Sequence, residues 1–251
     1  MIRSHIPELL DKITKATGVD EVWTLWTSYA EEFGIDRMFY AATHFRTLYG
    51  LGDVKDALIL TNYSKHYTDI YIEGGLFRDA PMVRWAMTEV GVRSFRDVHR
   101  DAVEGRLTPA EMKVLEFNAR QGVVAGYAIS FPRSSPRAGF GVGLSSTKMN
   151  QDAMDELWAE HGAEIELVSH VAHLAMISLP HGDHVRVLTP RQREVLELVA
   201  DGKTVQDVAL ILERNPATVE KHLRLAREAL DVETTAQAIR KVSVQNQVFL
   251  F

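Results

Sequence analysis

The amino-acid sequence predicts an α+β fold in two parts: an N-terminal α-β-α sandwich around an antiparallel sheet, and a C-terminal domain of four short helices. Three observations support this. Helical apolar patterns stand at both ends of the first 178 residues, with short apolar runs between them. The helix-breaking stretch 179–183 follows, and four capped helical patterns come after it. We therefore expect domains over residues 1–178 and 188–251, joined by a linker over 179–187.

Composition limits the class of protein before any motif is considered. The chain has 251 residues, of which 46% are apolar and 25% charged, and this balance suits two ordinary globular domains. The absence of cysteine excludes disulfides and thiolate metal sites. The first residues lack the apolar core of a signal peptide, and no apolar run is long enough to cross a membrane. We expect a soluble cytoplasmic protein without a membrane partner.

Local patterns predict each element of the N-terminal domain. Helical spacing of apolar side chains predicts helices at about 6–13, 22–33, 63–71, 81–88 and 151–178. Thr108-Pro109-Ala110-Glu111 has the residues of a capping box and predicts a helix that runs to Arg120. Apolar runs predict strands at 38–45, 57–61, 122–131 and 139–146. The glycines of the last run indicate a strand that a ligand or another backbone approaches closely.

The C-terminal segment has strong helix-start and helix-stop signals. Thr189 with Gln192 forms a capping box, Gly202 suits a left-handed helix end, and Thr204 and Asn215 suit the caps of the next two helices. A fourth helix begins near residue 234 or 235. Two short helices joined by a tight turn form a helix-turn-helix, whose second helix enters the major groove of DNA. The alternative is a plain helical bundle with a solvated charged face.

The outward residues of the second helix suit contacts with DNA. They are Thr218, Glu220, Lys221 and Arg224. Lys and Arg bind guanine edges or phosphates, a threonine hydroxyl suits a phosphate oxygen, and a glutamate can accept from a cytosine amino group. The overall charge gives no support to DNA binding, because the C-terminal segment is not strongly basic. The net charge is −6, and residues 186–241 hold ten Lys or Arg against nine Asp or Glu, a balance of +1 that leaves −7 elsewhere.

A family resemblance supports the DNA interpretation. The run from Leu188 to Leu196, then Gly202-Lys203-Thr204, then Ala217-Thr218-Val219-Glu220-Lys221-His222-Leu223, resembles the LuxR-type helix-turn-helix over about 188–240. The family usually has Glu where this chain has Gln192. The resemblance implies that the second helix reads DNA through Glu220, Lys221 and Arg224. It also implies a homodimer on a two-fold symmetric operator.

The N-terminal part is similar to the autoinducer-binding domain of quorum-sensing regulators. The similarity lies in the run from Asn62 to Tyr67, Tyr71, Asp79-Ala80-Pro81, Phe95 and Arg120-Gln121-Gly122. It implies an N-acyl-homoserine lactone as signal, held among aromatic and aliphatic side chains. The residues it implies as ligand-binding are Tyr67, Tyr71, Asp79, Phe95 and Ser145, with Trp85 as a nearby aromatic.

Several departures from the family pattern leave the ligand open. Tyr67 and Phe95 stand where the family has tryptophan, and Ala80 separates Asp79 from the proline. A shift of one helical position rotates a side chain by roughly 100°. A different acylated or aromatic ligand, or none, therefore stays possible. If these residues have only a structural role, the aromatic side chains pack in the core and Asp79 caps a helix.

Two alternatives to a ligand-responsive regulator stay open. A ligand-independent regulator would use the N-terminal domain only for dimerisation or protein contacts. An enzyme is not expected, because no Ser-His-Asp or paired-carboxylate spacing stands out. No cofactor or metal is expected either. His170 and His173 share one helical face, and His181 and His184 lie in the linker, but no third ligand is in register.

Overall fold

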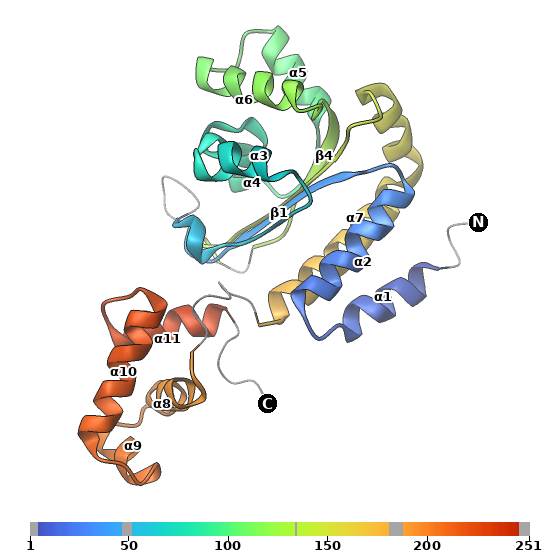
Figure 1. Ribbon diagram of the computed structural model, residues 1–251. Helices are drawn as coiled ribbons and strands as arrows, with labels where there is room; N and C mark the ends of the chain where they lie inside the picture. The colour runs from blue at the N-terminus through green and yellow to red at the C-terminus, as the bar shows by residue number, and fades with distance from the viewer. Residues whose placement is uncertain (1–4, 47–51, 134, 181–187, 246–251) are drawn as a thin grey trace. The chain divides into compact units, whose positions relative to one another are not determined.

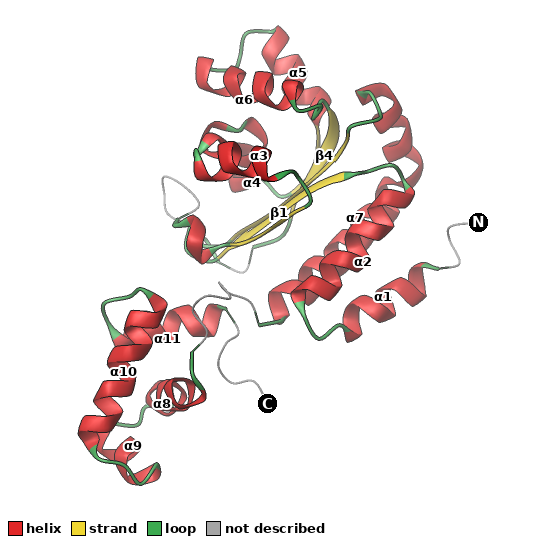
Figure 2. Cartoon of the chain, in the orientation of Figure 1, coloured by secondary structure: helices red, strands yellow, loops and turns green. Residues whose placement is uncertain are grey.

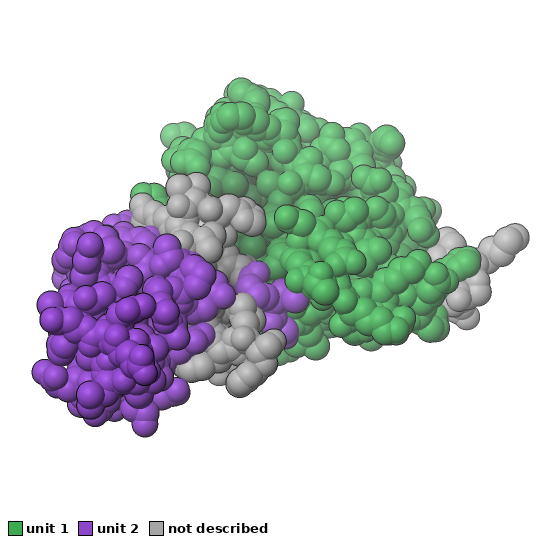
Figure 3. All heavy atoms as spheres, turned by 60° about the horizontal axis from the view of Figure 1, so that its bottom comes forward, with its two compact units in different colours: residues 1–177 green, residues 178–251 purple. Residues whose placement is uncertain are grey.

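The computed structural model describes residues 5–46, 52–133, 135–180 and 188–245. The chain divides into two compact units, Met1–Ile177 and Ser178–Phe251 (Figure 3). Residues 181–187 of the expected linker lie outside the described residues. Each unit is described by itself. No helix within the described ranges is both long and apolar enough to cross a membrane.

The N-terminal unit is built on one five-stranded sheet. Its strands are β1 (Arg37–Thr43), β2 (Leu58–Thr61), β3 (Gly91–Ser94), β4 (Ala125–Ser130) and β5 (Gly139–Ser146). They lie in the order β2-β1-β5-β4-β3, and every neighbouring pair is antiparallel. The predicted antiparallel sheet is confirmed. Strand β3 was missed because its four residues, Gly-Val-Arg-Ser, do not form an apolar run, whereas the equally short β2 does.

Helices cover both faces of the sheet, as predicted (Figure 1). One face carries α1 (Ile6–Lys15), α2 (Val19–Glu32) and α7 (Gln151–Ser178). The other carries α3 (Lys65–Thr68), α4 (Pro81–Thr88), α5 (Phe95–Val103) and α6 (Pro109–Arg120) (Figure 2). Short turns connect them: η2 (Val54–Asp56), the π-helical η3 (Asp69–Glu73) and η4 (Leu76–Asp79). The α-β-α sandwich is thus confirmed, and α5 is the helix that sequence reasoning missed.

The face toward α2 and α7 is a closed aromatic core. Strand β1 alternates, so Met38 and Tyr40 are fully buried on this side. Tyr40 packs edge-on against Trp26 of α2, and its hydroxyl lies 2.9 Å from Nδ1 of His173 on α7. Phe131 stacks on the same imidazole with ring centroids 4.2 Å apart. Burial lowers the pKa of His173 to about 3, so the ring is neutral at pH 7. In the tautomer protonated at Nε2, Nδ1 accepts a hydrogen bond from the Tyr40 hydroxyl.

The C-terminal unit contains α8 (Pro190–Ala200), α9 (Val205–Ile211), α10 (Pro216–Leu230) and α11 (Thr235–Val244). The predicted caps are present, because the side chains of Thr189, Thr204, Asn215 and Thr234 each accept a backbone N–H in the first turn. Apolar residues from all four helices form one buried core: Leu188, Val195, Leu196, Val208, Ala209, Val219, Leu223, Ala226, Leu230, Ala238 and Val242. This confirms the predicted four-helix domain.

Candidate functional site

A cavity of about 300 Å³ lies in the N-terminal unit. It is lined by the sheet and by the elements α3, η3, α4, α5 and α6. The described residues that line it include no Asp, Glu, Lys or Arg. The polar side chains are limited to tyrosines, Thr43, His99 and Asn118. Such a space suits a small molecule that is largely apolar and carries no charge.

The sheet forms the floor of the cavity, and its small residues leave the space there unfilled. Along β5, Gly139, Gly141 and Gly143 occupy alternate positions, which share one face of the strand. Gly143 pairs with Ala128 of β4, and Gly141 pairs with Ala41 of β1. Bulky side chains at these positions would fill the space. The expectation of a close approach at this glycine-rich strand agrees with the lining of the cavity.

Three tyrosines form one wall. Tyr63, Tyr67 and Tyr71 are spaced four residues apart, and Ser64 caps α3 between the first two. Their rings stack in sequence, with centroids 4.3 Å apart for Tyr63 and Tyr67 and 5.1 Å apart for Tyr67 and Tyr71. Phe39 of β1 packs edge-on against Tyr71. Because the rings occupy one another's faces, a ligand meets mainly their edges and hydroxyl groups.

Two of the three hydroxyl groups are committed to the protein. The Tyr63 hydroxyl lies 2.6 Å from Oγ of Ser145, and Ser145 in turn donates to the carbonyl of Arg37. The Tyr67 hydroxyl donates to Oδ1 of Asn118 at 2.9 Å. Burial raises the pKa of Tyr63 to about 12, and also raises that of Tyr67, so both groups are protonated donors at neutral pH.

Tyr71 is different. Its side chain is 8% exposed and lines the cavity, yet its hydroxyl has no hydrogen-bond partner within the part of the chain that the structure describes. Burial raises its pKa as well, which keeps the proton in place. The amide nitrogen of Asn118 likewise makes no hydrogen bond to a described residue. The cavity therefore offers a ligand two uncommitted donors, one from η3 and one from α6.

The structure brings only part of the predicted ligand set to the cavity. Tyr67, Tyr71 and Phe95 line it, whereas Asp79, Trp85 and Ser145 do not. Ser145 is buried behind Tyr63, and Trp85 is half-buried on α4 outside the lining.

Asp79 is exposed at the end of η4, and the next residue, Ala80, is 3% exposed and contributes to the cavity wall. Ala80 also stands at the N-cap of α4, where it provides no side-chain cap. Asp79 therefore does not take the cap position. The one-residue displacement noted in the sequence carries the carboxylate to the solvent side.

Two contributors were missed by sequence reasoning. Tyr63 precedes Tyr67 by one helical turn, and that spacing was a usable signal. Asn118 accepts a hydrogen bond from Tyr67, which lies 51 residues away in the chain, so no local sequence pattern connects the two residues.

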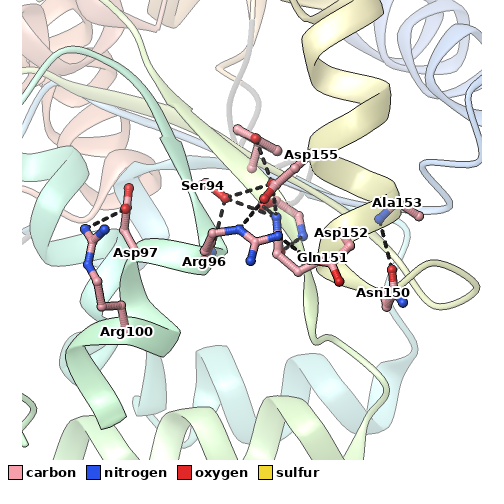
Figure 4. A network of polar contacts seen from close by, with 11 residues as sticks. Ser94, Arg96, Asp97, Arg100, Asn150, Gln151, Asp152, Ala153 and Asp155 are labelled. Carbon is pink, nitrogen blue, oxygen red and sulfur yellow. Dashed lines mark hydrogen bonds and ion pairs between the residues drawn. The ribbon is translucent and has the colours of Figure 1, made fainter. Parts of the chain in front are cut away.

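A polar network connects the start of α5 with the start of α7 (Figure 4). Phe95 stands between Ser94, which caps α5, and Arg96. Arg96 forms ion pairs with Asp152 and Asp155 at the start of α7, and Ser94 Oγ lies 3.2 Å from Asp155. Burial alone would raise the pKa of Asp155, but its hydrogen bonds outweigh burial and hold that pKa below its ordinary value. The network ties this cavity wall to α7.

The second candidate site is the outer face of α10. Its inner stripe is buried in the core of the C-terminal unit, and this directs Glu220, Lys221 and Arg224 to solvent, with Thr218 half-buried. Arg224 forms an ion pair with Glu228 one turn later. The turn between α9 and α10 is only Leu212 to Asn215, the tight connection that a helix-turn-helix requires.

Metal binding has no support in the described residues. No group of three His, Cys, Asp or Glu side chains there is placed to hold a metal ion. His181 and His184 lie outside the described residues. His170 and His173 pack against the ring of Phe131 instead.

Fold and site together define a small-molecule-binding α-β-α domain in one chain with a helix-turn-helix domain. The family model of the autoinducer binding domain matches residues 18–176, and that of sigma-70 region 4 matches residues 185–230. The chain therefore belongs to the LuxR-type transcriptional regulators with an autoinducer-binding domain.

Individual transcriptional regulators are similar to this chain in sequence or in structure. The quorum sensing-dependent regulator RpaR of Rhodopseudomonas palustris is 29% identical over 73% of this chain and 72% of its own. The transcriptional activator LuxR of Aliivibrio fischeri is 25% identical over 74% of this chain and 73% of its own. A crystal structure of Escherichia coli SdiA has the same fold, with a TM-score of 0.55 at 16% identity and full coverage of both chains. A second SdiA structure, in complex with octanoyl-rac-glycerol, has a TM-score of 0.56 at 15% identity, covering 99% of this chain and 98% of that one.

Proposed function

We propose that this regulator binds one small, uncharged, largely apolar signal in the cavity and that occupancy controls DNA binding by α10. The signal is an N-acyl-homoserine lactone or a related acylated molecule. The apolar cavity over the glycines of β5 carries this proposal, because a domain used only for dimerisation has no need of it. Tyr67, Tyr71 and Phe95 are the ligand contacts we propose.

The size and chemistry of the cavity favour an acyl chain. A cavity of about 300 Å³ is at the lower end of small-molecule sites, which bury most of a ligand's surface. Aliphatic and aromatic walls stabilise a buried hydrocarbon chain by about 0.8 kcal/mol per CH₂ group. The SdiA complex with octanoyl-rac-glycerol supports the proposal, since a relative in fold holds an acylated molecule.

DNA reading rests on the exposed face of α10. Lys221 and Arg224 lie on it beside Glu220, and the N-terminus of the helix is capped by Asn215. In a helix-turn-helix these positions meet base edges and phosphates in the major groove. We further propose residues 1–178 and 188–251 as the functional domains, and a homodimer on a two-fold symmetric operator with half-sites about one helical turn apart.

The proposed ligand binding is tested by a substitution on β5 that fills the cavity with a larger side chain. In Gly143→Leu the new side chain enters the cavity, because a Cβ at this position meets nothing closer than the Phe39 carbonyl oxygen at 4.0 Å. Gly143→Ala is the matched control, since it adds one methyl group and leaves most of the volume. Thermal shifts are measured with a panel of acyl-homoserine lactones of varied chain length and with octanoyl-glycerol. We expect stabilisation of the wild type and of Gly143→Ala, and none of Gly143→Leu.

The DNA part is tested on sites selected from a random duplex library by the full chain with signal. Lys221→Ala and Arg224→Ala should each weaken binding by roughly 5- to 150-fold, the range of one base contact. Lys113→Ala, an exposed lysine on α6, is the matched control and should change nothing. Unchanged affinity in both α10 variants would show that another surface reads DNA.

A further inference from the structure

The buried and half-buried hydrogen-bonding groups of the cavity are one-sided. Among the described lining residues, those without a hydrogen-bond partner are the hydroxyl of Tyr71 and the amide nitrogen of Asn118, and both are neutral donors. His99, which also lines the cavity without a hydrogen bond to a described residue, is exposed. No carboxylate lines the described wall, so the strongest acceptor available to a ligand N–H is absent. A ligand carbonyl can be satisfied here, whereas a ligand N–H would be buried beside phenol oxygens, which are weaker acceptors.

The missing acceptor has a specific position. Asp79 is exposed, and Ala80, one residue later, is buried in the same cluster as Tyr67, Tyr71 and Phe77. A carboxylate at position 80 would lie in the cavity wall and would also cap α4, which begins at Pro81 without a side-chain cap. The methyl group of Ala80 does neither. The residue at position 80 therefore determines whether a ligand N–H finds a carboxylate acceptor in the cavity wall.

We propose that the cavity selects a neutral acyl ester or ketone, whose polar end only accepts hydrogen bonds, over an N-acyl amide. The inference rests on the proposed ligand-binding function and deepens it. The acyl chain lies over the small residues of β5, and the carbonyl oxygen accepts from Tyr71 and Asn118. An amide in the same place loses its water partners and gains no anionic acceptor, which disfavours it.

A matched pair of probes tests the selectivity. N-octanoyl-homoserine lactone carries an amide N–H, and 2-octanoyloxy-γ-butyrolactone carries an ester oxygen at that one position. Dissociation constants are measured by calorimetry on the full chain. We expect the ester to bind the wild type about tenfold more tightly than the amide, because an unmatched N–H is costly to bury. A preference for the amide would overturn the proposal and leave the ligand-binding function standing.

The variants move the acceptor without changing composition. The double variant Asp79→Ala/Ala80→Asp shifts one carboxylate by one residue at constant net charge, and it should reverse the preference toward the amide by about tenfold or more. Asp79→Ala alone should leave both constants unchanged, because that side chain is exposed. Tyr71→Phe, which retains the ring, should weaken the ester by roughly 2- to 13-fold.

The outcomes separate the two proposals. An unchanged ester-to-amide ratio in a folded double variant would overturn the role of position 80. Should the double variant fail to fold, Tyr71→Phe decides: unchanged ester affinity then contradicts the assigned donor. If neither probe binds the wild type, the acylated-signal proposal fails together with this inference.

Discussion

The wall of the cavity and the outer face of α10 differ in their content of charged residues. The described residues that line the cavity include no Asp, Glu, Lys or Arg, whereas the exposed face of α10 carries Glu220, Lys221, Arg224 and Glu228 within three turns. Binding in the cavity removes apolar surface from water and is expected to depend little on salt. Binding at α10 replaces counterions on DNA and is expected to weaken steeply with salt. The two proposed binding functions are therefore expected to differ in their dependence on salt.

Acidic residues lie beside the basic residues on the exposed face of α10. Glu228 pairs with Arg224, and Glu220 lies one turn before it. With a balance of only +1 over residues 186–241, the domain has little non-specific attraction for a polyanion. We therefore expect selectivity to come from base contacts and from the proposed dimer.

The largest expected effect comes from placing a charge in the cavity wall. Ala128→Asp puts a carboxylate on β4 opposite Gly143, where no described cation lines the space. We expect it to lower the free energy of unfolding by about 3 kcal/mol or more, measured by urea denaturation at pH 7. Lys221→Glu on α10 reverses a charge on an exposed face and should change stability by less than about 0.5 kcal/mol. Comparable losses in the two variants would remove the contrast between cavity and helix face.

The second test extends the comparison to the opposite face of the sheet. His173 has its pKa lowered to about 3 by burial, with His170 and His44 nearby as further disfavouring groups. Its unfolded pKa is about 6.5, so the unfolded chain takes up a proton first as pH falls. The stability contributed by the neutral ring is present above pH 6.5 and is lost toward pH 3. Between pH 7 and pH 5 this loss is about 2 kcal/mol.

The variant His173→Asn removes this dependence and keeps an acceptor for the Tyr40 hydroxyl. Its unfolding free energy should fall by about 2 kcal/mol less than that of the wild type between pH 7 and pH 5, measured by urea denaturation. His5→Asn is the control, because His5 is exposed. Equal pH dependence in wild type and His173→Asn would mean that the imidazole is charged or hydrated in the folded protein.

The two regions also differ in how far the sequence predicts them. The helices of the C-terminal unit begin at side chains such as Thr189 and Asn215 whose partners lie two or three residues away, so their pattern is local. The cavity depends on pairs such as Tyr63 with Ser145 and Tyr67 with Asn118, which are 82 and 51 residues apart. Local patterns predicted most elements but missed β3 and α5, and the resemblance named two of the tyrosines that line the cavity. Packing decided which other side chains line it. The position of Ala80 between Asp79 and Pro81 indicated from the sequence that Asp79 is displaced, but not that its side chain is exposed.

The smallest expected effect concerns the turn that presents α10. Three helices of the C-terminal unit end in the same way, with a left-handed residue at Gly202, Glu213 or Asp231. In each case the next N–H bonds back to a carbonyl one turn earlier, Lys203 to Leu198, Arg214 to Ala209 and Val232 to Arg227. Glycine adopts this conformation freely and aspartate tolerates it, whereas a long side chain at a φ of 51° carries a steric cost.

Glu213→Gly should therefore raise the free energy of unfolding of the chain by about 1 kcal/mol, because it removes that cost at an exposed position. Glu213→Ala retains a Cβ and should give no gain, which separates backbone strain from the loss of a negative charge. Urea denaturation of the three proteins side by side measures both effects. An equal gain in both variants would assign the effect to charge and not to the backbone. If Glu213→Gly also leaves DNA affinity unchanged, the strain is a tolerated feature of the turn and does not aim α10 at its operator.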